Sequence, residues 1–255
     1  MDFSRLKADA KRWQTAFVLL LAVALVGVFH SPWVIWAFLG IVFIFAFHEA
    51  MSLYELKNES WLYVLAIVLW IGAVFYPKPE DLLFLGLILL ASLVAFRQRF
   101  DAKIVLPLLY PATPMLFLLS LYHEFGITAF VWLLFIVVSC DVGAYFAGKT
   151  MGKTPFSPSS PNKTVEGVTG GITTAAILGT LAGLMLDLGW LTTLLITLAA
   201  AFASIFGDLF ESYLKRQAGV KDSGHILPGH GGVLDRIDGY LFAGVVLTLG
   251  LRAFA

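Results

Sequence analysis

The feature that most constrains this chain is a series of apolar segments, each close in length to a membrane-spanning helix. The hydrocarbon core of a bilayer is about 30 Å thick, and a helix of about 20 apolar residues crosses it. Only 13% of the 255 residues are charged, against about 25% in a typical soluble domain. The apolar runs are continuous rather than alternating, which favours helices over the strands of a barrel. The sequence therefore predicts an all-α integral membrane protein.

We expect about nine transmembrane helices joined mostly by short connections. Their approximate bounds are 14–29, 32–48, 61–76, 81–96, 104–121, 127–148, 170–188, 190–214 and 237–254. No fixed repeat or separate soluble segment interrupts them, so the whole chain, 1–255, is expected to form a single polytopic domain. Within it, 1–126 would supply N-terminal helices, and 127–255 would supply the catalytic helices and their cytosolic loops.

Positive charge is distributed unevenly between the predicted connections. With a cytosolic N-terminus, 15 of the 17 Lys and Arg residues lie on the cytosolic side, and only Lys78 and Arg252 lie outside. The positive-inside rule therefore predicts a cytosolic N-terminus, and an odd number of helices places the C-terminus outside. The two long polar connections, 149–169 and 215–236, then both face the cytosol. The formal net charge is zero, so we expect no nucleic-acid partner.

Two aspartates lie inside apolar helices. Asp141 and Asp208 are each about seven residues from the cytosolic end of a predicted helix, which corresponds to a depth of about 10 Å. A charged Asp within a membrane helix costs about 2.5–3.5 kcal/mol, so each should face a polar cavity and have a partner. A structural hydrogen bond between helices is the alternative explanation for either residue.

Polar residues around Asp208 follow the helical period. Asp208, Glu211, Ser212 and Lys215 are spaced i, i+3, i+4 and i+7, which places them on one helix face. This stripe predicts the wall of a cavity that opens to the cytosol. A helix end emerging into water would explain Glu211 and Lys215, but it would not explain Asp208.

The connection after this helix is rich in charge and glycine. Gly229, Gly231 and Gly232 surround His230, and glycine backbones can approach an anion closely. Asp235 and Asp238 are spaced i, i+3 and could share a metal ion. Carboxylates beside Lys and Arg suit a magnesium–polyphosphate complex, because oxygen ligands hold the ion and cations hold the remaining phosphate oxygens. A merely solvated loop is the alternative.

Specific residues in the two long connections and at the adjoining helix ends extend this pattern. They are Ser212-Tyr-Leu-Lys215-Arg216, Lys221-Asp222, Leu227-Pro228-Gly229-His230-Gly231-Gly232, Asp235-Arg236-Ile237-Asp238, and Ser160-Pro161-Asn162-Lys163-Thr164 with Glu166-Gly167. Asp141, Ala144-Tyr145 and Gly148 precede the last block. Together they resemble the phosphatidate cytidylyltransferase (CDP-diacylglycerol synthase) family over about 139–240. The predicted helices before this stretch add only general hydrophobicity.

The resemblance implies a nucleotidyltransferase of phospholipid biosynthesis that uses Mg²⁺ and transfers CMP from CTP to phosphatidic acid. It implies catalytic roles for Asp208, Lys221, Asp235, Arg236 and Asp238, and substrate contacts for Lys163, Ser212, Lys215, Arg216 and His230. It implies magnesium ligands at Asp208, Asp235, Asp238 and, as a weaker candidate, Asp141. His230 could instead brace the glycine turn. We expect a multi-pass protein of the bacterial inner membrane, with its site facing the cytosol. A homodimer is a further possibility.

Rival functions make different predictions. A CTP-dependent lipid kinase would share the nucleotide site but release CDP, whereas an ion-coupled transporter would need polar sites on both faces of the membrane. A CDP-alcohol phosphotransferase is disfavoured because Asp238-Gly239 is not followed by that family's motif. Residues 143–150 fit a P-loop expression, but they end a membrane helix and follow no strand, so we reject that match. Gly179 and Gly183 predict a helix-packing contact, within or between subunits.

Overall fold

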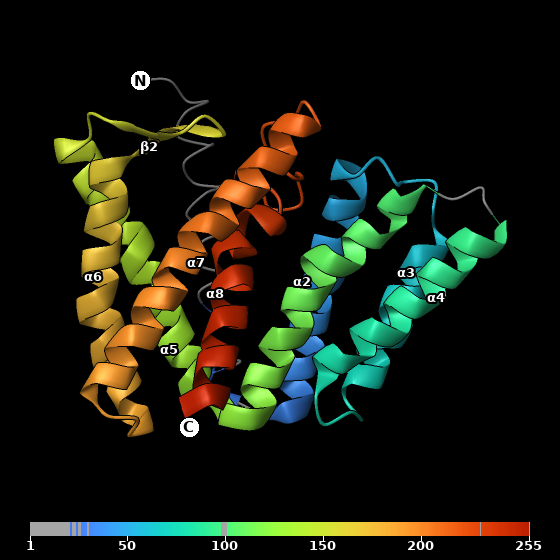
Figure 1. Ribbon diagram of the computed structural model, residues 1–255, viewed down its shortest axis with the longest axis horizontal. Helices are drawn as coiled ribbons and strands as arrows, with labels where there is room; N and C mark the ends of the chain where they lie inside the picture. Colours follow the sequence, from blue (N-terminus) through green and yellow to red (C-terminus); the bar gives the residue numbers. More distant parts are fainter. Residues whose placement is uncertain are drawn as a thin grey trace.

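The structure is a computed structural model that describes residues 21–254, with gaps at 22–23, 25–26, 30, 98–100 and 230. The predicted helix at 14–29 lies largely outside the described residues. The helices run side by side as a bundle (Figure 1). They are α2 (Pro32–Leu53), α3 (Trp61–Ala73), α4 (Leu82–Arg97), α5 (Thr113–Met151), α6 (Val165–Gly183), α7 (Trp190–Gln217) and α8 (Leu234–Phe254). Short helical turns occupy Pro79–Asp81, Ala102–Val105, Leu108–Ala112 and Leu184–Leu186.

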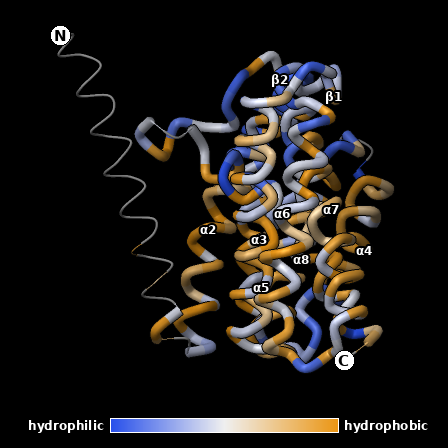
Figure 2. Tube along the Cα trace, turned by 90° about the vertical axis from the view of Figure 1, so that its left-hand side faces the viewer, coloured by the Kyte–Doolittle hydropathy of each residue, from blue (hydrophilic) through white to orange (hydrophobic). Residues whose placement is uncertain are grey.

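Six helical stretches in the described part of the chain are long and apolar enough to cross a membrane. They are Pro32–Leu53, Pro79–Arg97, Ala102–Met151, Val165–Leu186, Trp190–Gln217 and Leu234–Phe254. Figure 2 shows apolar residues along most of their length, with hydrophilic residues gathered toward the two ends of the bundle. The prediction of a helical, multi-pass membrane protein is therefore confirmed.

The six stretches differ from the nine predicted helices in identifiable ways. Besides the undescribed first segment, α3 is an apolar helix of only 13 residues, shorter than the predicted segment 61–76 and not among the six stretches. The predicted helices 104–121 and 127–148 lie in the single 50-residue stretch Ala102–Met151. This stretch bends at Gly126, whose φ of 69° is readily adopted by glycine. In Figure 1 the chain runs down beside α2 and returns as the segment labelled α5.

One small element departs from the all-α prediction. β1 (Pro155–Ser157) pairs antiparallel with β2 (Ser160–Thr164) in the connection between α5 and α6. Glu166 fixes the base of this hairpin by accepting hydrogen bonds from the backbone N–H groups of Lys153 and Thr154, at 3.1 and 3.2 Å. Residues 143–150 are helical in α5, which runs on to Met151, and no strand precedes it in the described part of the chain, so the rejection of the P-loop is confirmed.

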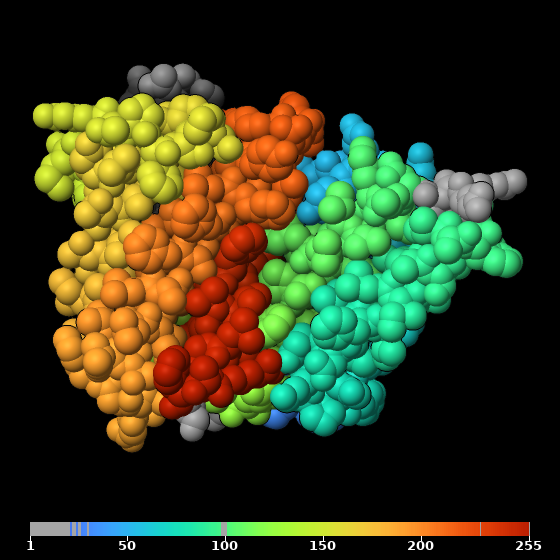
Figure 3. Space-filling view, in the orientation of Figure 1, coloured from blue at the N-terminus to red at the C-terminus, as the bar shows by residue number. Residues whose placement is uncertain are grey.

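Glycines allow the helices around the carboxylates to pack closely. Gly207 of α7 faces α8, where an added Cβ would lie 2.5 Å from the Asp238 carbonyl oxygen and 3.1 Å from Phe242. Helix α8 is seated between α7 and the earlier part of the bundle in Figure 3. Small residues permit such close approach of helices in membranes. Here the close contact brings together α7 and α8, which carry Asp208 and Asp238.

Gly179 and Gly183 also have packing roles. Gly179 faces Thr197 and Ile136, whereas Gly183 faces Trp132 and Thr193. The predicted helix-packing contact therefore lies within the chain. The homodimer stays a prediction, and these two glycines provide no argument for it.

Replacing Gly207 with Ala should force α7 away from α8, because the new methyl group would overlap backbone that cannot rotate aside. Overpacking of this kind costs about 1–3 kcal/mol, so the melting temperature of the purified protein in detergent should fall. Gly72→Ala is the matched control, since its Cβ would lie 3.4 Å from the Leu82 side chain at ordinary contact distance. Equal melting temperatures for the two variants would contradict the close α7–α8 contact.

Candidate active site

A polar cavity of about 310 Å³ lies where α5, α7 and α8 meet the loop after α7. Its lining residues are Val137, Asp141, Asp208, Lys215, Asp222, Asp235, Arg236, Asp238 and Tyr240. Five carboxylates and two cations thus surround one space, although they come from positions almost 100 residues apart in the sequence. A site with this composition suits a ligand that combines phosphates with a divalent cation.

The two aspartates predicted inside helices both reach this cavity. Asp141 lies ten residues before the end of α5, and Asp208 lies nine residues before the end of α7. These positions correspond to about 15 and 14 Å along the helix axes, which is farther than the predicted 10 Å because both helices extend beyond their apolar runs. The cavity supplies the polar environment that each carboxylate was expected to need.

Asp208 has partners from two elements. Lys163 of β2 forms an ion pair with its carboxylate, and the Ser212 hydroxyl donates a hydrogen bond to Oδ1 at 3.4 Å. The hairpin thereby brings a cation from the connection between α5 and α6 against an acid within α7. The sequence offered each residue as a candidate but gave no indication that they form a pair.

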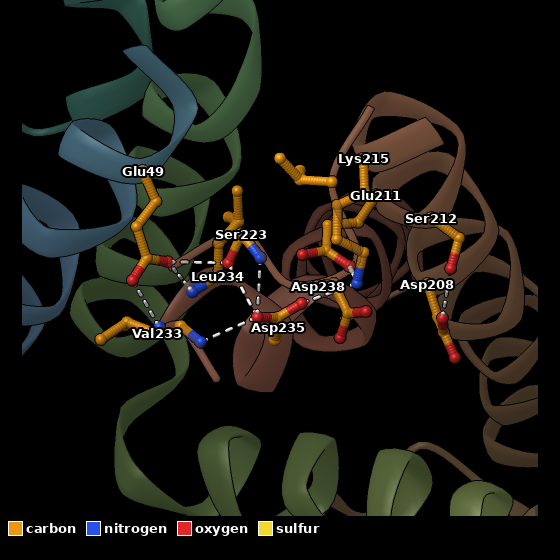
Figure 4. A network of polar contacts seen from close by, with 12 residues as sticks. Glu49, Asp208, Glu211, Ser212, Lys215, Ser223, Val233, Leu234, Asp235 and Asp238 are labelled. Carbon is orange, nitrogen blue, oxygen red and sulfur yellow. Dashed lines mark hydrogen bonds and ion pairs between the residues drawn. The ribbon is translucent and has the colours of Figure 1, made fainter. Parts of the chain in front are cut away.

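Lys215 joins α7 to the start of α8. Its ammonium group contacts Glu211 on the same helix and lies 2.6 Å from Asp235 Oδ1, as Figure 4 shows. Glu211 is fully buried, with an exposed fraction of 0%. The alternative of a helix end emerging into water is therefore wrong for Glu211, because this residue packs inside the protein and has Lys215 as its counter-ion.

Asp235 is held on both of its oxygens. While Oδ1 contacts Lys215, Oδ2 accepts hydrogen bonds from the backbone N–H groups of Ser223 and Gly232, at 2.9 and 2.8 Å, and from the Ser223 hydroxyl at 3.0 Å. Asp238 lies one helical turn further along α8 and lines the same cavity. The two aspartates predicted to share a metal ion thus have different surroundings, with Asp235 anchored by the loop.

The remaining predicted residues fall into three groups. Arg236 lines the cavity, as predicted for a catalytic cation. Arg216 and Lys221 are exposed and are not among its lining residues, and an Arg216 N–H lies 3.4 Å from the Val220 carbonyl oxygen. His230 lies outside the described residues.

No group of three or more His, Cys, Asp or Glu side chains within the described ranges is arranged to hold a metal ion by itself. The donor chemistry nevertheless fits magnesium. Mg²⁺ is usually held by one or two carboxylates, with water and substrate phosphates completing the shell. Asp141, Asp208 and Asp238 offer carboxylate oxygens at the cavity, so phosphate oxygens would complete a site there.

Three residues of this region were assigned no role from the sequence. Asp222 and Tyr240 line the cavity, and Glu49 of α2 binds the loop after α7 through three hydrogen bonds. The available signal for Glu49 was the same one that identified Asp141, a carboxylate inside an apolar helix. The sequence does not single out Glu49 because it lies one residue beyond the predicted helix 32–48, whereas α2 extends to Leu53.

Replacing Lys215 with Met should leave Glu211 buried without its cation. Removal of one partner from a buried ion pair costs about 3–5 kcal/mol, so we expect a large fall in melting temperature in detergent. Lys103→Met is the control, because Lys103 and Glu55 form an exposed pair at 3.9 Å, with 53% and 79% of their side chains accessible. Such pairs contribute about 0–1 kcal/mol, and similar small shifts for both variants would contradict the buried bridge.

Comparison of the sequence with known proteins identifies the family of this chain. Residues 10–254 match the cytidylyltransferase family. A phosphatidate cytidylyltransferase of Helicobacter pylori (strain ATCC 700392 / 26695) is 41% identical over 246 residues, covering 96% of this chain and 91% of the relative. A protein of the same name from Bacillus subtilis (strain 168) is 40% identical over 187 residues, covering 70% of this chain and 70% of the relative. Another, from Staphylococcus saprophyticus, is 32% identical over 227 residues, covering 81% of this chain and 86% of the relative. The chain therefore belongs to the cytidylyltransferase family.

Proposed function

We propose that this chain transfers CMP from CTP to phosphatidic acid, giving CDP-diacylglycerol and pyrophosphate, as a membrane-bound nucleotidyltransferase of phospholipid biosynthesis. The observation that carries the proposal is the cavity of acidic and basic side chains among apolar helices. It occurs in a chain that is similar, along most of its length, to relatives named phosphatidate cytidylyltransferase. A water-soluble nucleotide and a lipid phosphate can both reach such a cavity.

The reaction needs charge control more than proton transfer. An oxygen of the lipid phosphate forms a bond to the α-phosphorus of CTP, and the bond from that phosphorus to the bridging oxygen of pyrophosphate breaks. The lipid phosphate is already an oxyanion near neutral pH, so no strong base is required. The obstacle is the approach of two anions and the charge that develops on pyrophosphate, which fixed cations stabilise.

The cations that line the cavity, Lys215 and Arg236, suit this task together with Lys163, which pairs with the lining residue Asp208. Lys163 and Lys215 are held by Asp208 and Asp235, so both ammonium groups are in place before substrate arrives. Arg236 adds a guanidinium group, which can bind phosphate through two parallel hydrogen bonds. Ser212 holds Asp208. For Arg216, Lys221 and His230, the proposed contacts with CTP or the lipid head group rest on the resemblance to the family.

Magnesium would be held by Asp208 and Asp238, with Asp141 as the further candidate. When bound, the ion would neutralise phosphate charge and so reduce repulsion between the two substrates. Asp235 accepts hydrogen bonds from two backbone N–H groups, those of Ser223 and Gly232, as well as from Lys215. The partners of Asp208 described above are the side chains of Lys163 and Ser212. We therefore assign Asp235 the role of holding Lys215 toward the cavity.

Purified protein in detergent micelles with phosphatidic acid, labelled CTP and Mg²⁺ should release pyrophosphate and form CDP-diacylglycerol. Asp208→Asn should lower this turnover at least about 100-fold, because the amide is a neutral and weaker magnesium ligand. Asp187→Asn is the control, since Asp187 lies in the turn between α6 and α7, far along the bundle from the cavity. Near wild-type turnover of Asp208→Asn would contradict the metal assignment, and formation of lipid phosphate with CDP would favour the kinase.

We further propose nine membrane-spanning helices in a bacterial inner membrane, with a cytosolic N-terminus, an outside C-terminus and the cavity facing the cytosol. The support is the distribution of Lys and Arg between the connections. In a Cys140→Ser background, Pro158→Cys in the hairpin should react with an impermeant maleimide only after cell lysis. Asp187→Cys, at the other end of α6, should react in spheroplasts, and the reverse pattern would overturn the orientation.

A further inference from the structure

We propose that Glu49 of α2 is a positioning residue of the active site, which acts through Ser223 and Asp235 to hold Lys215 at the cavity. This inference rests on the function proposed above. It also assigns a task to the N-terminal helices, where the sequence offered no candidate residue. Glu49 does not line the cavity, so its effect must pass through the loop that it binds.

Glu49 caps the start of a helix to which it does not belong. Its Oε1 accepts a hydrogen bond from the Val233 backbone N–H at 2.9 Å, and its Oε2 accepts one from the Leu234 backbone N–H at 2.7 Å. The first N–H groups of a helix have no partner within it and carry partial positive charge. With an exposed fraction of 2%, Glu49 therefore supplies a buried counter-charge at the N-terminus of α8.

The loop is shaped around this carboxylate. An added Cβ on Gly224 would collide with Glu49 Oε1, and one on Gly232 would collide with Glu49 Oε2 and the Ser223 hydroxyl. Glycine at both positions leaves just the room that the carboxylate fills. Since Glu49 already occupies the N-terminus of α8, substrate phosphates must be bound by the cavity cations and not by these backbone N–H groups.

The connection from Glu49 to the cavity has three steps. The Ser223 hydroxyl lies 2.9 Å from Glu49 Oε2 and 3.0 Å from Asp235 Oδ2, and its single hydrogen is shared between two acceptors. The Ser223 backbone N–H donates to Asp235 as well, at 2.9 Å. Asp235 then contacts Lys215 at 2.6 Å, and Figure 4 shows this sequence of contacts leading from α2 to α7.

A second buried carboxylate offers a control for a purely structural role. Glu80 has an exposed fraction of 6% and accepts a hydrogen bond from the Ser120 hydroxyl. It also pairs with Arg252 at 2.6 Å, near the C-terminus. Glu80 thus ties helices together as Glu49 does, but its described partners, Ser120 and Arg252, are not among the residues that line the cavity.

The test is a double-mutant cycle with Glu49→Gln, Ser223→Ala and their combination, beside Glu80→Gln. We expect Glu49→Gln to lower kcat/KM for CTP about 10- to 100-fold, the range typical of residues that hydrogen-bond to the groups that contact a ligand and so fix their orientation. The combined variant should be no worse than Glu49→Gln alone, because both residues act along one pathway. Glu80→Gln should lower the melting temperature while kcat/KM stays within about twofold of wild type.

Independent, multiplicative losses for Glu49→Gln and Ser223→Ala would overturn the proposal, as would unchanged kcat/KM with a lowered melting temperature. If Glu49→Gln does not fold, Ser223→Ala alone decides: a several-fold loss supports the pathway, and wild-type kcat/KM overturns it. Absence of CDP-diacylglycerol from the wild type would contradict the proposed function instead. In that case, amide hydrogen exchange of residues 221–234 tests the role of Glu49. We expect faster exchange in Glu49→Gln but not in Glu80→Gln. Unchanged exchange in Glu49→Gln would overturn the proposal.

Discussion

The ion pairs of Lys215 are the interaction on which the rest of the site depends. Apolar helices provide little solvation for charge, so a carboxylate buried between them needs a cation or several hydrogen-bond donors. Lys215 serves Glu211 from its own helix and Asp235 from α8. It therefore fixes the separation of α7 and α8 at the cavity while keeping a positive charge beside it. Stability and the proposed phosphate binding therefore depend on the same ammonium group.

Periodicity within one helix made part of this site predictable. Asp208, Ser212 and Lys215 share a face of α7 by spacing alone, and the cost of a buried charge identified Asp141 as a residue that needs polar surroundings. Both predictions are local, because they depend on residues within a few helical turns. The multi-pass helical architecture was predictable for the same reason, since each apolar run carries its own evidence.

The unpredicted features all depend on contacts between distant segments. The Lys163–Asp208 pair joins a hairpin to a helix, and Glu49 meets Ser223 from 174 residues away in the chain. Neither the i, i+4 spacing of a helix nor the alternation of a strand contains such information. The change of direction at Gly126, in contrast, falls in the predicted connection between the helices 104–121 and 127–148, although the helical stretch continues through it. Sequence reasoning thus found the chemical groups more readily than their pairing.

The hairpin of β1 and β2 makes chain length itself a constraint. Successive side chains of a strand point to opposite faces, and Thr164, directly after Lys163, accepts the Gly167 N–H at the start of α6. Lys163 is therefore held one residue from a fixed helix cap, in a register set by the pairing of Pro155 with Thr164. Loss or gain of a single residue in this ribbon would turn the ammonium group away from Asp208. This short connection can vary in composition far more freely than in length.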